Sequence, residues 1–591
     1  MRIFPALVLS STLALCVACA QAPDRSVAST LASANNLSAQ AEEGSFEERA
    51  RRLLGGGSNA SAADGLDEGL LYKFLLAEIA GQRGDVALAA QTYVELARAT
   101  QDAGVARRAT ELALFARMNE VALEAARIWL DAEGGSPAAR QALATLLVNS
   151  RNLDAARPLL AEVLAAESDD PGQALLQVHG VLSQYPDKDA VHDLIVDLTG
   201  PYRDHAEAHY AIAQSAYVAG RHEAARSAVR EALQIRPDWP SAALLHAKLL
   251  AQDSREPSLD YLSAYLQRNP EAQEVRLAYA RNLINDKRFR EARSEFQKLL
   301  ASNPDNADIA LTVAFLSLQM NDIEVADAQL KRALELGYQD PDTIRFQLGQ
   351  VNEDLQRLEE AGRWYRAVSG GEQYVVAHAR YALLLAKQQR LEEARAYLQG
   401  LAPQTEEQRV QLVQAEAHLL RELRQYDASY RVLRDALDAQ PDHPDLLYDI
   451  ALAAEKLNRL DVVEGNLRKL ITMKPDHAQA YNALGYTLAD RTGRLTEAYE
   501  YIEKALQLAP EDPFVLDSMG WVHYRLGNYK EGLEYLRRAY EQRDDPEIAA
   551  HLGEVLWAEG RRDEAETIWR KSLQDHPDNE ALQNTMRRFL R

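Results

Sequence analysis

Residues 482–513 read NALGYTLADRTGRLTEAYEYIEKALQLAPEDP, and the two stretches after them follow the same plan. These are DSMGWVHYRLGNYKEGLEYLRRAYEQRDDP at residues 517–546 and AHLGEVLWAEGRRDEAETIWRKSLQDHPDN at residues 550–579. Each has a small residue in a first apolar segment, a turn with Gly or Asn, and a small residue in a second segment. A turn containing proline closes the unit, because proline cannot continue a helix. The sequence therefore predicts a repeated pair of helices.

The repeat extends over more than half of the chain. Its first small residue recurs, with a mean spacing of 34 residues, at Ala213, Ala247, Ala280, Ala314, Gly349, Ala382, Ala417, Ala451, Gly485, Gly520 and Gly553. The second small residue follows twelve positions later in most copies, at Ala225, Ala292, Ala326, Ala361, Ala394, Gly532 and Ala565. Small residues are expected where two helices cross closely, since a larger side chain would wedge them apart.

This pattern resembles the tetratricopeptide repeat (TPR), a helix–turn–helix unit of 34 residues. The resemblance implies an all-α fold, a solenoid of TPR helical hairpins that coils into a right-handed superhelix. Roughly 13–15 units are expected. A regular array is predicted at residues 205–578, preceded by degenerate TPR-like repeats at 67–204 and followed by a capping helix at 579–591. Between about Asp169 and Tyr202 the motif is least clear, and irregular packing is expected there.

Length and charge restrict the classes of function. The chain has 591 residues, too many for a single compact core, which stops growing near about 250–300 residues. Its net charge of -23 disfavours nucleic acid as a partner, because phosphate backbones would be repelled. Solubility alone would also explain that charge. Cys16 and Cys19 are the only cysteines, so the body of the protein has no thiolate metal site and no disulfide.

The first residues have the composition of an export signal. Arg2 is followed by an apolar run at residues 3–17, which is shorter than the roughly 20 residues that span a bilayer. Ala18 precedes Cys19, and this arrangement resembles the signal of bacterial lipoproteins, in which the cysteine after the cleavage point is acylated. Cys16 stands where that family prefers Leu. An ordinary secretory signal is the alternative.

The lipoprotein resemblance implies a division of the N-terminal region. Residues 1–18 would be the signal peptide, and Cys19 would carry the lipid. Residues 19–66 are rich in Ala, Ser, Gly and Asn and are typical of a flexible linker. Ala20 replaces the Asp that retains such lipoproteins in the inner membrane. We therefore expect an outer-membrane protein, anchored by lipid only, with its body in the periplasm.

The repeat register predicts which side chains face a binding groove. Positions three before and one, four or five after the first small residue should point inward. They are Tyr210, Arg281, Phe346, His418, Tyr448, Glu455, Asn482, Tyr486, Asp517, Trp521, Tyr524, Arg525 and Trp557. The cluster of Tyr486, Trp521, Tyr524, Arg525 and Trp557 is the most suggestive, because aromatic residues and Arg dominate binding hot spots. Ordinary helix packing is the alternative explanation for any one of them.

No catalytic motif interrupts the repeats. The sequence contains no His-Glu-x-x-His, no Gly-x-Ser-x-Gly and no phosphate-binding loop. We therefore predict that the protein is not an enzyme and that it has no catalytic residue, no metal site and no cofactor.

The layout as a whole resembles bacterial outer-membrane TPR lipoproteins that bind a periplasmic carboxyl-terminal processing protease. This resemblance implies a non-catalytic adaptor that recruits and activates the serine protease and delivers peptidoglycan hydrolases to it as substrates. The periodicity by itself predicts only a binding solenoid. Two alternatives stay open: a TPR scaffold of an envelope assembly or polysaccharide-export complex, and an enzyme that acts alone.

Overall fold

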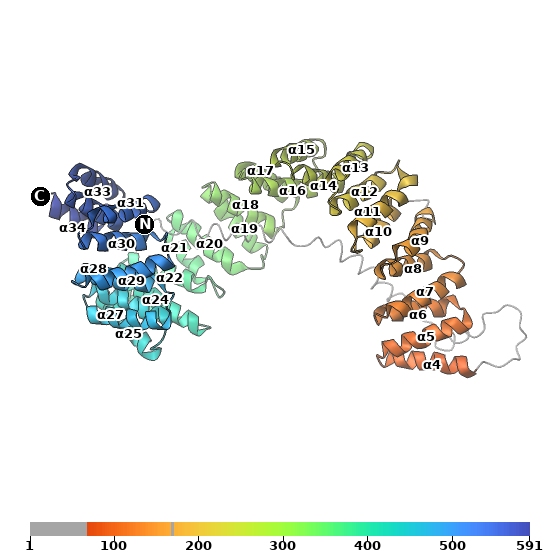
Figure 1. The fold of residues 1–591 in the computed structure, drawn as a ribbon, viewed down its shortest axis with the longest axis horizontal. Coiled ribbons are helices and arrows are strands. Elements are labelled where there is room, and N and C mark those ends of the chain that lie inside the picture. Colours follow the sequence, from red (N-terminus) through yellow and green to blue (C-terminus); the bar gives the residue numbers. More distant parts are fainter. Residues whose placement is uncertain (1–67, 167–170, 591) are drawn as a thin grey trace, which may run out of the picture. The chain divides into compact units, whose positions relative to one another are not determined.

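The computed structural model describes residues 68–166 and 171–590. Within these ranges the chain forms thirty-one α-helices, one short 3-10 helix and no strand, which confirms the all-α prediction (Figure 1). No helix in these two ranges is long and apolar enough to cross a membrane. The predicted signal peptide at 1–18, the predicted lipid site at Cys19 and the predicted linker at 19–66 lie outside the described residues.

The chain divides into two compact units between Gln329 and Leu330, within α19 (Ile323–Glu335). The helices of the first unit are α4 (Glu68–Gln82), α5 (Val86–Thr100), α6 (Ala103–Phe115), α7 (Asn119–Ala132), α8 (Pro137–Asn149), α9 (Leu153–Ala166), α10 (Pro171–Leu182), α11 (Lys188–Leu198), the 3-10 helix η1 (Gly200–Tyr202), α12 (Ala206–Val218), α13 (His222–Ile235), α14 (Pro240–Leu250), α15 (Arg255–Arg268), α16 (Gln273–Asn285), α17 (Phe289–Ser302) and α18 (Ala307–Gln319).

The second unit continues with the same alternation of helices. They are α20 (Pro341–Asp354), α21 (Leu358–Arg366), α22 (Tyr374–Lys387), α23 (Leu391–Gln399), α24 (Glu406–Glu422), α25 (Tyr426–Ala439), α26 (Pro444–Lys456), α27 (Leu460–Met473), α28 (Ala478–Arg491), α29 (Leu495–Leu508), α30 (Pro513–Arg525), α31 (Tyr529–Gln542), α32 (Pro546–Ala558), α33 (Arg562–Asp575) and α34 (Glu580–Phe589). Even-numbered helices are the first helices of the hairpins, and odd-numbered helices are the second.

Each hairpin is held together where its two helices cross at small residues. A Cβ atom added to Gly520 of α30 would lie 2.5 Å from Leu536 Cγ of α31. One added to Gly485 of α28 would lie 2.5 Å from Ile502 Cγ1 and 2.9 Å from the Ala498 carbonyl oxygen of α29. Real side chains do not tolerate such distances, so these positions admit glycine only. The small residues predicted from the period are therefore the crossing points of the hairpins.

The turn inside most hairpins uses one residue with a left-handed backbone. Gly527 has φ of 87° and Asn458 has φ of 56°, each just after a first helix. The N–H of Asn528 then donates to the carbonyl of His523 at 2.9 Å, which satisfies a free carbonyl at the end of α30. The Gly or Asn that the sequence places in this turn is explained by that backbone conformation.

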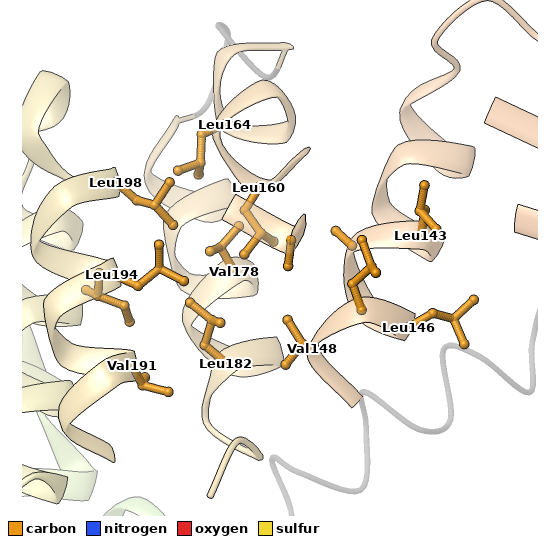
Figure 2. Packing of buried hydrophobic residues seen from close by; sticks show 14 of the residues in the cluster. Leu143, Leu146, Val148, Leu160, Leu164, Val178, Leu182, Val191, Leu194 and Leu198 are labelled. Carbon is orange, nitrogen blue, oxygen red and sulfur yellow. The ribbon is translucent and has the colours of Figure 1, made fainter. Parts of the chain in front are cut away.

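The hairpin of α10 and α11 is irregular, as expected for the stretch between Asp169 and Tyr202. Both helices pack on α12 and do not cross each other as closely as the other pairs do. Large aliphatic side chains fill the space between them, and Figure 2 shows Leu194 and Leu198 of α11 directed toward Val178 and Leu182 of α10. Without a matched pair of small residues, the two helices stay apart and the leucines form the contact.

The last helix, α34, lies over the final hairpin. Leu582 is fully buried, and the ring of Phe589 lies 5.8 Å from that of Trp569, measured between centroids. The side chain of Asn579 accepts a hydrogen bond from the N–H of Leu582 at 2.9 Å and caps the start of the helix. Terminal repeats need such a cover, because the apolar face of a repeat is otherwise buried only by its neighbour.

The crossing points can be tested by adding one methyl group. We expect Gly485→Ala to lower the free energy of unfolding of the C-terminal unit by about 1–3 kcal/mol, because the new Cβ would meet the backbone of α29. Gly465→Ala, in the neighbouring α27, is the matched control: nothing lies within 4 Å of its Cβ position. That control should be stabilised by about 0.5–1 kcal/mol through helix propensity. Urea titration followed by tryptophan fluorescence would measure both, and equal effects would contradict the crossing model.

Candidate partner-binding site

Three successive first helices of the C-terminal unit meet around His551. Its Nδ1 lies 2.9 Å from both carboxylate oxygens of Asp517, and its ring stacks on the indole of Trp521 with centroids 4.2 Å apart. The hydroxyl of Tyr486 lies 3.4 Å from His551 Nε2. Tyr486 belongs to α28, Asp517 and Trp521 to α30, and His551 to α32. We call these four residues the His551 cluster.

The electrostatics of the His551 cluster favour a charged imidazole. Burial lowers the pKa of His551, but the carboxylates of Asp517, Glu547 and Glu554 together outweigh that effect, so the pKa is raised overall. The imidazolium then donates to Asp517 through Nδ1. Burial raises the pKa of Tyr486, and the nearby carboxylates of Asp490 and Asp517 raise it further. The tyrosine therefore stays neutral and offers its oxygen to His551.

Tyr524 is engaged with the end of the array. Its hydroxyl donates to Glu554 Oε1 at 3.2 Å, and the guanidinium of Arg588 from α34 pairs with the same carboxylate. Burial, followed by the charge of Glu554, raises the pKa of Tyr524 to about 12. The Tyr524 ring also lies 5.2 Å from that of Trp521, so it is continuous with the His551 cluster.

Trp557 and Arg525 lie outside that cluster. The indole of Trp557 stacks on Trp569 with centroids 5.8 Å apart and lies 5.9 Å from the ring of Phe589, so it packs beneath the terminal helix. Arg525 donates to the backbone carbonyl of Asp490 at 3.1 Å and thereby links α30 to α28.

Tyr448 and Asn482 complete the predicted set. The Tyr448 ring lies 5.6 Å from that of His477, and burial raises the pKa of its hydroxyl, assisted by Asp449. Asn482 makes one long hydrogen bond, from Nδ2 to the carbonyl of Phe514 at 3.5 Å. Its Oδ1 is buried and has no partner among the described residues.

The structure thus brings four of the eight predicted C-terminal residues together, namely Tyr486, Asp517, Trp521 and Tyr524. Asp517 and Trp521 are only 7% and 6% exposed, because both pack against His551. Contact of these residues with a partner stays a prediction. Two other residues expected to face inward are packed in the core instead: Phe346 is 2% exposed and Tyr210 is 9% exposed.

Sequence reasoning missed His551, which the cluster depends on. His551 stands two residues before Gly553, outside the register positions used to select inward residues. Its partner Asp517 lies 34 residues earlier, one full repeat away. A search for opposite charges one period apart would have found the pair.

Catalytic and metal chemistry find no support in the described ranges. No group of three His, Cys, Asp or Glu side chains in residues 68–166 and 171–590 is placed to hold a metal ion. A hollow of about 540 Å³ lies between α9 and α11 and is walled mainly by carbon atoms, including Leu164, Leu198 and Pro201. One hydroxyl among the described residues does touch a base, since Ser215 Oγ lies 2.9 Å from His192 Nδ1 of α11, but both side chains are buried.

The ion pair of the His551 cluster predicts a specific pH dependence. Because the folded pKa of His551 is raised, its stabilising contribution is complete below the ordinary value of about 6.5 and is lost as pH rises through the folded pKa. Asp517→Asn should remove or reverse this dependence and lower the free energy of unfolding by about 3–5 kcal/mol at low pH, because burial then disfavours the imidazolium and Asp517 no longer offsets it.

Urea unfolding of the C-terminal unit between pH 5 and 9 measures that dependence. Asp578→Asn is the control, because Asp578 is exposed and carries the same charge. Parallel pH profiles for wild type and Asp517→Asn would contradict the assignment.

Comparison with known proteins gives the family of the chain. Three tetratricopeptide-repeat profiles match it, at residues 476–545, at 283–345 and 523–589, and at 190–240, 316–375 and 415–462. The chain is 33% identical over 491 residues to TPR repeat-containing protein PA4667 of Pseudomonas aeruginosa, with 82% of each protein covered.

The chain is also similar, at low identity, to two solved structures. The crystal structure of yeast Tom70 is 15% identical, with a TM-score of 0.33, covering 71% of this chain and 96% of that chain. The APC/C hetero-tetramer Cut9-Hcn1 is 14% identical, with a TM-score of 0.28, covering 89% of this chain and 97% of that chain. By its repeat profiles and its similarity to the Pseudomonas protein, the chain belongs to the tetratricopeptide-repeat proteins, which are generally non-catalytic scaffolds that bind other proteins.

Proposed function

We propose that this TPR scaffold is anchored to the outer membrane through lipid on Cys19 and serves as an adaptor in the periplasm. It recruits and activates a carboxyl-terminal processing protease and delivers peptidoglycan hydrolases to it. The observation that carries the scaffold role is the run of helical hairpins within each of the two compact units. Stacked repeats expose extended surfaces and suit the binding of extended partners.

The adaptor role is supported by the sequence outside the array. The apolar leader that ends in Ala18 and Cys19, the long linker and the many repeats together resemble the lipoprotein partners of processing proteases. A lipid anchor with a tethered binding body suits recruitment, because it concentrates a soluble protease near membrane-attached substrates. The chain would then supply positioning, and the protease would supply all of the catalysis.

Capture of partners tests the adaptor role. The full chain with a C-terminal affinity tag, extracted from bacterial envelopes in mild detergent, should retain a processing protease and at least one peptidoglycan hydrolase. Mass spectrometry identifies the retained proteins, and an unrelated tagged outer-membrane lipoprotein is the control. Absence of a processing protease would overturn the adaptor role. Retention of a β-barrel export protein in its place would favour the envelope-assembly scaffold.

The anchor is tested separately. We expect Cys19→Ala to move the protein from the membrane fraction to the soluble periplasmic fraction and to abolish incorporation of labelled palmitate, because the acylated thiol is lost. Cys16→Ala, three residues upstream in the leader, should change neither result. A wild-type protein that is already soluble, or that takes up no label, would show that Cys19 is not acylated.

A further inference from the structure

Arg281 of α16 is a half-buried cation without a counter-charge. None of the described residues forms an ion pair or a hydrogen bond with its guanidinium, and burial alone lowers its pKa. Other half-buried arginines nearby are paired: Arg276, on the same helix, contacts Glu295 at 2.5 Å, and Arg293 contacts Asp322 at 2.6 Å. A charge that is partly withdrawn from water and has no counter-charge costs free energy. The described residues of this chain leave Arg281 without a counter-charge, and a binding partner could supply one.

Arg281 and Lys248 occupy the same register position on successive first helices. Each residue follows the first small residue of its helix, Ala247 in α14 and Ala280 in α16, and these two helices pack on each other. Lys248 Nζ lies 4.6 Å from the ring centroid of Tyr217 on α12. Tyr217 is the fourth residue after Ala213, the small residue of that preceding first helix. For Arg281 the equivalent neighbour is Ala251, whose methyl side chain offers neither an aromatic ring nor a hydrogen-bond acceptor.

The surrounding positions are apolar or neutral. At the four inward positions of α12, α14, α16 and α18, Lys248 and Arg281 are the only charged residues. Leu244 and Ile284, at two of these positions, are half-buried, and Val218 is 56% exposed. In a chain of net charge -23, this combination is a local positive and apolar face. We call it the Lys248–Arg281 face.

We propose that the Lys248–Arg281 face binds an extended segment of a partner protein. The segment carries acidic side chains at positions i and i+3, and at least one of the two residues between them is apolar. Neighbouring packed helices lie about 8–10 Å apart. A polyproline II segment advances about 3.1 Å per residue and has three residues per turn. Side chains i and i+3 therefore point the same way and lie about 9 Å apart, which matches the distance between the two helices. One carboxylate pairs with Arg281 in the two-pronged geometry that guanidinium favours, and the other pairs with Lys248.

The presence of two separate cations favours an internal acidic segment over a chain terminus or a single phosphate. A single C-terminal carboxylate or one phosphate would neutralise one cation and leave the other, whereas an internal acidic segment satisfies both. The proposal rests on the scaffold role of the array and does not depend on the protease adaptor role. The acidic-segment proposal and the protease adaptor role can therefore be disproved independently of each other.

Selection from a peptide library tests the proposal. Random twelve-residue peptides, displayed with both ends blocked, are selected on the immobilised full chain. Enrichment of Asp or Glu at two positions three residues apart, at least tenfold over the unselected library, is the expected result. Arg281→Gln should abolish that enrichment, and Arg281→Glu should replace it by Lys or Arg at one of the two positions.

Arg290→Gln is the matched control, because Arg290 is exposed on the second helix α17 and its loss changes the net charge equally. It should leave the enrichment intact. Selection of peptides without paired acidic residues, no selection at all, or the same motif on Arg281→Gln would each overturn the proposal.

The stability of the variant separates a binding role from a structural role. Removing an unpaired, half-buried charge should leave the unfolding midpoint of Arg281→Gln unchanged or raise it. A lowered midpoint would assign Arg281 to the packing of the fold and would overturn the proposal. Failure of the protease to be captured from envelopes, with the acidic motif still selected, would count against the adaptor role alone.

Discussion

Everything in this chain depends on how closely the two helices of each hairpin can cross. At Gly485 and Gly520 the space that a Cβ atom would need is already occupied by the partner helix. That close approach lets a large side chain four residues further along the second helix, such as the fully buried Trp569, fill the hairpin interior. Close packing at the crossing fixes the angle between the helices, and the angle repeats because the small residues repeat. The solenoid is the accumulated result of one local constraint.

The irregular hairpin of α10 and α11 shows what happens when the small residues are absent. Helices α10 and α11 lack the matched small residues, and they pack on α12 without crossing each other closely. Leucines and valines such as Leu182 and Leu194 then fill the wider space, so the core stays continuous although the hairpin is irregular. A repeat array tolerates such a defect, because an irregular unit can still bury its apolar face against its neighbours.

The two first-helix surfaces described above differ in how their polar groups are satisfied. Around His551 the imidazole, the carboxylate of Asp517 and the hydroxyl of Tyr486 serve one another across three repeats, which joins those repeats into a rigid block. Around Arg281 the described part of the chain supplies no counter-charge, although Arg276 on the same helix pairs with Glu295. Polar side chains that pair with one another contribute to the fold. A charged side chain that stays unpaired costs free energy and is better explained by a ligand that it binds.

The sequence by itself determined the repeat, its period, the crossing residues and the all-helical class, because these follow from local spacing and from the size of single side chains. It also selected Tyr486, Asp517, Trp521 and Tyr524 from their register, which predicts that each lies on the inward side of its own helix. It could not show that Asp517 and Trp521 are buried against His551, because that contact joins residues one repeat apart and depends on how tightly successive hairpins pack. For the same reason only the tertiary structure revealed that Arg281 has no partner: a pairing between helices is decided by distances in space, which the spacing of residues along the chain does not set.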